Sequence, residues 1–197
     1  ALKGIICLVR VEDFDAGVVL PHEETLSKAK QDRFSLMQAT NCNFSQIYSL
    51  YMDETGETRR RIDHLSSGTP RYEFSDGLVT HRLWIVNDAV AIEAFRSDFA
   101  ARRLYIADGH HRYETAINYR NYCRENAVWA PGSEFVMMML VDMENPGLVV
   151  FPTHRLVRGL PDFSPEQVLA GSAAYFDAET LSDRGAVEPR LKADYDA

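Results

Sequence analysis

The chain has 197 residues, of which 46% are hydrophobic and 25% are charged. These proportions are ordinary for a globular protein, and they exclude intrinsic disorder, a collagen-like repeat and a small disulfide-stapled fold. Acidic residues exceed basic ones by 29 to 21, for a formal net charge of −8, so the chain has no general attraction to nucleic-acid phosphates. The longest apolar runs, residues 135–141 and 148–151, are too short for a membrane span of about 20 residues. We therefore expect a soluble folded protein with neither a nucleic-acid nor a membrane partner.

The cysteines indicate a reducing compartment. There are three of them, Cys7, Cys42 and Cys123, without the paired spacing of a disulfide framework or a thiolate zinc site. The first ten residues lack the basic start and cleavage signature of a secretory signal. We expect a cytoplasmic protein. Because the chain has no initiator methionine and stops in the charged stretch 190–197, we also expect a fragment of a longer protein.

Apolar spacing predicts a buried strand over residues 4–11 and a helix over 24–40. Four apolar residues share one face of that helix: Leu26, Ala29, Leu36 and Met37. Arg33 falls in the middle of this face and Lys30 at its edge. A guanidinium in such a setting needs an anion. We therefore predict that Arg33 is at least half buried and either pairs with Asp108 or Glu23 or points toward a phosphate beside Arg112.

The rest of the chain alternates strands, turns and helices. The predicted elements are a strand at 44–51, a mobile loop at 53–69, a hairpin at 72–86, a helix capped by Asn87 or Asp88, a strand at 103–107, a helix at 113–126, and strands at 135–143 and 148–157. Ser164 begins a capping box that opens a further helix. The composition becomes more acidic after Asp142. We expect two domains, residues 1–159 and the truncated start of a second unit at 160–197.

The strongest functional signal is the run Asp-Gly-His-His-Arg at residues 108–112, between a predicted strand and a helix. Gly109 permits a tight turn with positive φ, and the helix that follows directs free N–H groups and a positive dipole end into it. His110, His111 and Arg112 add donors for a phosphate. Asp108 offers an oxygen to a divalent cation. A solvated polar turn is the alternative interpretation.

Two further segments carry candidate residues. Pro-His-Glu at residues 21–23 stands at a predicted helix start, where Glu23 is either a cap that complements the dipole or a functional carboxylate. Pro-Thr-His-Arg at residues 152–155 interrupts a predicted strand, where His154 and Arg155 are either surface groups on an edge kink or ligands.

These segments together resemble the bacterial and archaeal family DUF1015, of uncharacterised function. The resemblance rests on the run 104–116, on Pro-His-Glu-x-Thr at 21–25, on Lys-x-Asp-Arg at 30–33 and on Pro-Thr-His-Arg at 152–155. It extends over about residues 4–157. Members of that family are roughly twice as long, which agrees with the expected fragment.

The run at 108–112 is in turn similar to the phosphate-binding box of the ParB and sulfiredoxin superfamily, which includes free-serine kinases. That similarity implies an α+β fold with a mixed sheet and flanking helices. It implies that Glu23 is the base, that Asp108 holds magnesium or orients a hydroxyl, and that the two histidines and Arg112 bind phosphate. His110 stands where sulfiredoxin has its cysteine, so sulfur reduction is not expected.

We therefore expect a phosphotransferase that binds ATP, ADP or CTP with Mg²⁺ and acts on a small hydroxylated metabolite, with free serine as the candidate that the resemblance implies. Catalytic roles are expected for Glu23, His22 and Asp108. The expected nucleotide ligands are Gly109, His110, His111, Arg112, Arg33, Lys30, His154 and Arg155. One alternative is a hydrolase in which His22, His110, His111 and His154 bind Zn²⁺ or Mn²⁺ and Glu23 activates water. Another is an effector-binding module without turnover.

Overall fold

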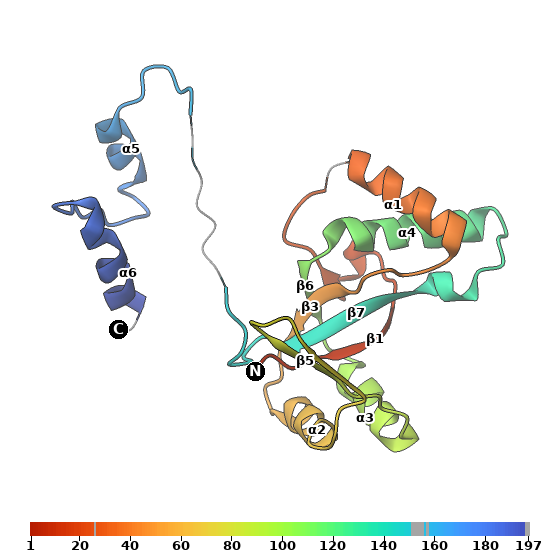
Figure 1. The fold of residues 1–197 in the computed structure, drawn as a ribbon. Coiled ribbons are helices and arrows are strands. Elements are labelled where there is room, and N and C mark those ends of the chain that lie inside the picture. The colour runs from red at the N-terminus through yellow and green to blue at the C-terminus, as the bar shows by residue number, and fades with distance from the viewer. Residues whose placement is uncertain (26, 151–155, 157, 196–197) are drawn as a thin grey trace. The chain divides into compact units, whose positions relative to one another are not determined.

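Five strands form one mixed sheet in the order β1-β7-β3-β6-β2 (Figure 1). The strands are β1 (Ile5–Arg10), β2 (Val19–Leu20), β3 (Ile47–Tyr51), β6 (Leu104–Asp108) and β7 (Phe135–Asp142). β7 is antiparallel to β1 and parallel to β3, whereas β6 is antiparallel to β3 and parallel to β2. A separate antiparallel hairpin consists of β4 (Tyr72–Ser75) and β5 (Thr80–Leu83). The computed structural model describes residues 1–25, 27–150, 156 and 158–195.

Helices flank the sheet, as expected for the α+β class. α1 (Ser27–Thr40) and α4 (His110–Glu125) lie above it in Figure 1, and α2 (Glu57–Leu65) and α3 (Ala89–Phe99) lie below. The buried core joins the sheet to α4: Ile47, Ile106 and Met138 from the strands meet Tyr113 and Ala116 from the helix. Side chains of β1 alternate between partly buried and exposed, which is the period-two pattern of a strand with one covered face.

The segment predicted to be a mobile loop, residues 53–69, contains α2, so that prediction is wrong. Its polar side chains find partners that local spacing does not reveal. The Asp53 carboxylate accepts the N–H of Arg59 at 2.9 Å, and the Thr58 hydroxyl donates to Asp98 at 3.0 Å. Arg61 lies 3.4 Å from the same Asp98 carboxylate. Contacts with α3 thus stabilise a helix whose sequence is mostly polar.

The chain divides into a unit of Ala1–Val150 and a unit of Phe151–Ala197, whereas the sequence suggested a boundary after residue 159. The second unit contains α5 (Pro165–Ser172) and α6 (Val187–Tyr195). Ser164 caps α5 by accepting the N–H of Gln167, as the capping box predicted. The predicted strand at 148–157 is not formed at residues 148–150, and most of its remainder lies outside the described residues. No helix in the described part of the chain is long and apolar enough to cross a membrane.

Candidate functional site

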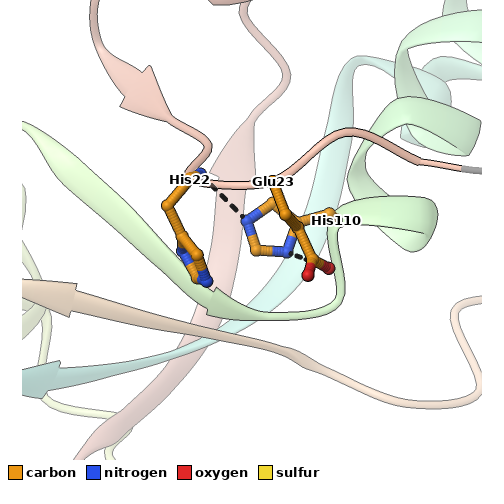
Figure 2. Close-up of side chains that lie close together, drawn as sticks. All are labelled: His22, Glu23 and His110. Atoms are coloured by element: carbon orange, nitrogen blue, oxygen red, sulfur yellow. Dashed lines mark hydrogen bonds and ion pairs between the residues drawn. The ribbon is translucent and has the colours of Figure 1, made fainter. Parts of the chain in front are cut away.

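The site lies at the carboxyl ends of the parallel strands β2 and β6. Val19 is in register with Leu104 and Leu20 with Tyr105, in parallel. Because parallel strands have their carboxyl ends at the same edge, the residues that follow them meet there, as ligand-binding residues commonly do in parallel sheets. His22 and Glu23 follow β2, and His110 begins α4 after Gly109. Figure 2 shows the three side chains together.

His22 is held by a carbonyl group of β6. Its Nδ1 lies 2.8 Å from the oxygen of Ile106. A carbonyl oxygen only accepts, so Nδ1 carries the proton and Nε2 of the neutral ring keeps its lone pair. The His22 ring meets the His110 ring edge-on, with centroids 4.5 Å apart. This arrangement orients His22 as many proteins orient a metal-binding or proton-accepting histidine.

His110 is 1% exposed and links both segments. Its Nε2 lies 3.2 Å from the backbone nitrogen of His22 and accepts that N–H, so the neutral ring has its proton on Nδ1. Nδ1 lies 3.1 Å from Oε1 of Glu23, although the contact does not have hydrogen-bond geometry and Nδ1 has no other partner among the described residues. Burial lowers the pKa of His110, and the nearby Glu23 opposes that shift.

Glu23 lies between the buried His110 ring and the solvent. Its side chain remains 55% exposed while one carboxylate oxygen lies beside His110 (Figure 2). A carboxylate in this position is accessible to a bound molecule on one side and lies beside the His110 ring on the other. It can accept a proton from a hydroxyl group or from water.

The same three residues could hold a metal ion. His22, Glu23 and His110 each offer one ligand atom, and these atoms lie within 4.8 Å of one another. His22 Nε2 and the Glu23 carboxylate have lone pairs available. His110 would have to move its proton from Nδ1 to Nε2, which breaks the bond from the His22 N–H. Two of the three ligands are therefore ready for Zn²⁺ and the third is not.

Asp108 and Arg112 pair with each other. Nη2 of Arg112 lies 2.5 Å from Oδ2 of Asp108, and Nη1 donates to the Ser45 hydroxyl at 3.0 Å and to the carbonyl of Gln46. Arg112 thereby ties the end of β6 to the start of β3. Asp108 is 74% exposed at its side chain and does not belong to the metal-capable group found among the described residues.

Gly109 has the backbone conformation that the sequence predicts for the turn. Its φ is +102°, which a residue with a side chain rarely adopts. A Cβ at this position would also lie 2.9 Å from Nη2 of Arg112. Glycine therefore permits both the turn into α4 and the close approach of the Arg112 guanidinium. α4 begins at His110, three residues before the predicted start.

Lys30 and Arg33, both predicted nucleotide ligands, differ in their surroundings. Lys30 pairs with Glu114 of α4 at 2.6 Å, and both side chains are about one quarter exposed. Arg33 is exposed and forms no hydrogen bond or ion pair with any residue that the structure describes. It lines a small hollow of about 50 Å³ together with Arg112, which leaves open the predicted alternative of a phosphate between them.

The predictions that Arg33 is at least half buried and that it pairs with Asp108 or Glu23 are both wrong. The covered face of α1 contains Lys30, Phe34 and Met37, with Phe34 edge-on to Tyr119 and Tyr122 of α4. This face is rotated by about one residue from the predicted one. An aromatic contact with α4, which only the tertiary structure provides, decides which side of the helix is buried.

The other predicted ligands are less well placed or lie outside the described residues. His111 is partly exposed in the first turn of α4, and its carbonyl accepts the Thr115 hydroxyl at 2.6 Å. His154 and Arg155 lie outside the described residues. The sequence did not indicate that Glu114 would hold Lys30 or that Ser45 would contact Arg112. Local spacing places Glu114 one helical turn after His110, on the same face of α4, and this could have marked Glu114 as a residue near the site.

The comparisons with known proteins identify a family and nothing closer. A family model described as "Protein of unknown function (DUF1015)" matches residues 1–195. No curated protein and no solved structure matches the chain.

Proposed function

The chain belongs to the DUF1015 family, and we propose that it is a nucleotide-binding phosphotransferase that acts on a hydroxyl group of a small metabolite, with free serine as one candidate. The observation that carries this proposal is the half-exposed Glu23 carboxylate held 3.1 Å from buried His110 at the start of α4. Similarity of the 108–112 box to the ParB and sulfiredoxin superfamily supports it, and we propose that fold for Ala1–Val150.

In this proposal Glu23 accepts the proton of the attacking hydroxyl, and His110 keeps its carboxylate in place. The amino end of α4 attracts the phosphates. Arg112 uses three of its five N–H donors within the chain, so two remain for a ligand. Arg33, across the same small hollow, adds a second cation. Phosphoryl transfer requires mainly such positioning and charge neutralisation.

Mg²⁺ with ATP, ADP or CTP is the cofactor set that the proposal includes. Mg²⁺ is commonly bound through one or two carboxylates together with substrate phosphates. The exposed Asp108 carboxylate fits that role because Arg112 binds its Oδ2 oxygen and not its Oδ1 oxygen. When bound, the ion would supply positive charge opposite the transferred group.

Turnover and binding test this proposal separately. Glu23→Gln should abolish phosphoryl transfer to a panel of small alcohols that includes serine, measured by ³¹P NMR, and should leave nucleotide affinity unchanged. Glu24→Gln is the matched control, because Glu24 is the exposed neighbour. Arg33→Met should weaken nucleotide binding at least tenfold, about 1.4 kcal/mol. Full turnover by the Glu23→Gln protein would refute the assignment of the base. Nucleotide binding without any turnover would support the effector-binding module.

A metal-dependent hydrolase is the second candidate, favoured by the proximity of the ligand atoms of His22, Glu23 and His110. It predicts that Zn²⁺ or Mn²⁺ raises the melting temperature of the wild-type protein and leaves that of His22→Ala unchanged. Metal analysis after purification without chelators provides the second measurement. A stoichiometric ion that is lost with His22→Ala would favour the hydrolase over the phosphotransferase.

A further inference from the structure

A second candidate site lies at the opposite end of the strands, where β3 and β7 have their last residues. β3 and β7 are parallel, and their last residues, Tyr51 and Asp142, are in register. β3 is antiparallel to β6, with Tyr48 opposite Asp108. Tyr51 is three residues further along β3, about 10 Å from the edge that carries Asp108. The two carboxyl ends therefore face away from the site formed by His22, Glu23 and His110.

A cavity of about 250 Å³ lies at these strand ends. It has five times the volume of the hollow beside Arg33, which is about 50 Å³. β3 and β7 contribute its inner wall, and α2, the first residues of the chain and the turn after β7 contribute the rest. The residues used in the argument below are Lys3, Tyr51, Arg59, Asp63 and Asp142.

Two buried polar atoms on the inner wall lack hydrogen bonds within the described chain: Oη of Tyr51 and Oδ2 of Asp142. Tyr51 is 0% exposed and Asp142 is 3% exposed. Nη1 of Arg59 forms an ion pair with Oδ2 at 3.6 Å, which is beyond hydrogen-bond distance. Buried polar groups in native proteins almost always have a partner, so these two indicate a molecule that enters the cavity.

The charges near the cavity favour a donor with positive charge. Burial raises the pKa of Tyr51, and the carboxylates of Asp53, Asp142 and Asp98 raise it further, against a smaller opposing effect of Arg102. Lys3 at the rim is already paired with Asp63 at 2.7 Å. The three carboxylates together therefore outweigh Arg102 at the Tyr51 hydroxyl. An anion in contact with Oδ2 of Asp142 would meet a carboxylate oxygen that can only accept hydrogen bonds.

We propose that this cavity binds a small molecule through a primary ammonium group, which donates hydrogen bonds to Oδ2 of Asp142 and Oη of Tyr51. An ammonium group offers three donors and no acceptor, so it can satisfy both oxygens at once. It also places a hydrogen-bonded cation beside a buried carboxylate whose ion pair with Arg59 is 3.6 Å long, which a neutral hydroxyl group would not. This site is separate from the proposed phosphoryl-transfer site and does not depend on it.

Titration of the ¹⁵N-labelled chain with propylammonium, followed by amide chemical shifts, tests the proposal directly. Propan-1-ol and propionate are the neutral and anionic probes of the same length. We expect saturable shifts from millimolar propylammonium, centred on the ends of β3 and β7, and none from the other two probes. Equal binding of propan-1-ol, preferential binding of propionate, or no saturable shift with propylammonium would each overturn the proposal.

Variants identify the two oxygens. Asp142→Asn should weaken propylammonium binding about tenfold, and Tyr51→Phe about threefold to tenfold. Tyr51→Phe removes a hydroxyl that has no hydrogen-bond partner among the described residues, so this protein should fold even if Asp142→Asn does not. Tyr48→Phe is the control, because the Tyr48 hydroxyl is also buried with no hydrogen bond to the part of the chain that the structure describes, and Tyr48 does not line the cavity. Equal affinity of the Tyr51→Phe and Tyr48→Phe proteins would contradict the assigned contact.

Discussion

The backbone N–H of His22 donates a hydrogen bond to Nε2 of His110 at 3.2 Å, although 88 residues separate them in the chain. This bond fixes the proton of the neutral His110 ring on Nδ1, the nitrogen that faces Glu23. One buried imidazole thereby joins the segment after β2 to the start of α4. It also places the protonated ring nitrogen 3.1 Å from the carboxylate of the candidate base.

Replacement of His110 should lower stability more than replacement of an exposed histidine. His110→Leu leaves the partly buried N–H of His22 without its acceptor, which costs about 1–3 kcal/mol. His64 is exposed on α2, and His64→Leu should change the free energy of unfolding by less than about 0.5 kcal/mol. Urea denaturation of both variants measures the difference. Equal losses would show that the bond to His22 contributes nothing.

The stability of the protein should fall as His110 becomes protonated. Burial lowers its pKa, with His22 and His111 adding to the effect and Glu23 and Asp108 opposing it. The unfolded chain, in which histidine has a pKa of about 6.5, therefore binds the proton first. The contribution is complete above about pH 6.5 and is lost as the pH decreases further. Urea denaturation between pH 8 and pH 5 should show a steeper decrease for the wild-type protein than for His110→Leu. Parallel profiles would rule out His110 as the source.

Alanine at Gly109 should be costlier than alanine at another glycine with positive φ. Gly77 has φ of +92° and no atom within 4 Å of a Cβ position, whereas a Cβ at Gly109 would meet the Arg112 guanidinium at 2.9 Å. Gly77→Ala should cost about 1–2 kcal/mol through backbone strain alone. Gly109→Ala should exceed that by about 1 kcal/mol because Arg112 must move. Thermal unfolding of the two variants gives the comparison, and equal costs would show that Arg112 adjusts freely.

The ion pair between Lys30 and Glu114 should stabilise the contact of α1 with α4. Burial raises the pKa of Glu114, but Lys30, Thr25 and His111 together outweigh it and lower the pKa. A double-mutant cycle with Lys30→Met and Glu114→Gln should give a coupling energy of about 1 kcal/mol. The exposed pair Glu93 and Arg96 is the control, at less than about 0.5 kcal/mol. A Lys30 cycle no larger than the control would leave Lys30 free to bind phosphate.

Local patterns determined much of the first unit. The apolar residues at 4–11 predicted the strand β1, although every second side chain of it is exposed and the strand is not fully buried as expected. The Ser-Asp-Gly turn predicted the β4 and β5 hairpin, and Asp88 caps α3 as expected by accepting the N–H of Ala91. The 108–112 run predicted the turn at Gly109 and, with three other segments, the DUF1015 family. These features depend on residues within a few positions of each other, so their physical causes are present in the sequence itself.

Tertiary structure alone decided which side chains meet. Arg33 remained outside the buried face of α1 because Phe34 packs against Tyr119 and Tyr122 of α4. Arg112 contacts Ser45 because β3 runs antiparallel to β6, so the start of β3 lies beside the end of β6. The sequence indicated His22, Glu23 and His110 as separate candidates, and the parallel register of β2 with β6 brings their ligand atoms within 4.8 Å of one another. Pairing between strands that are distant in the sequence depends on the whole sheet, so local spacing does not predict it.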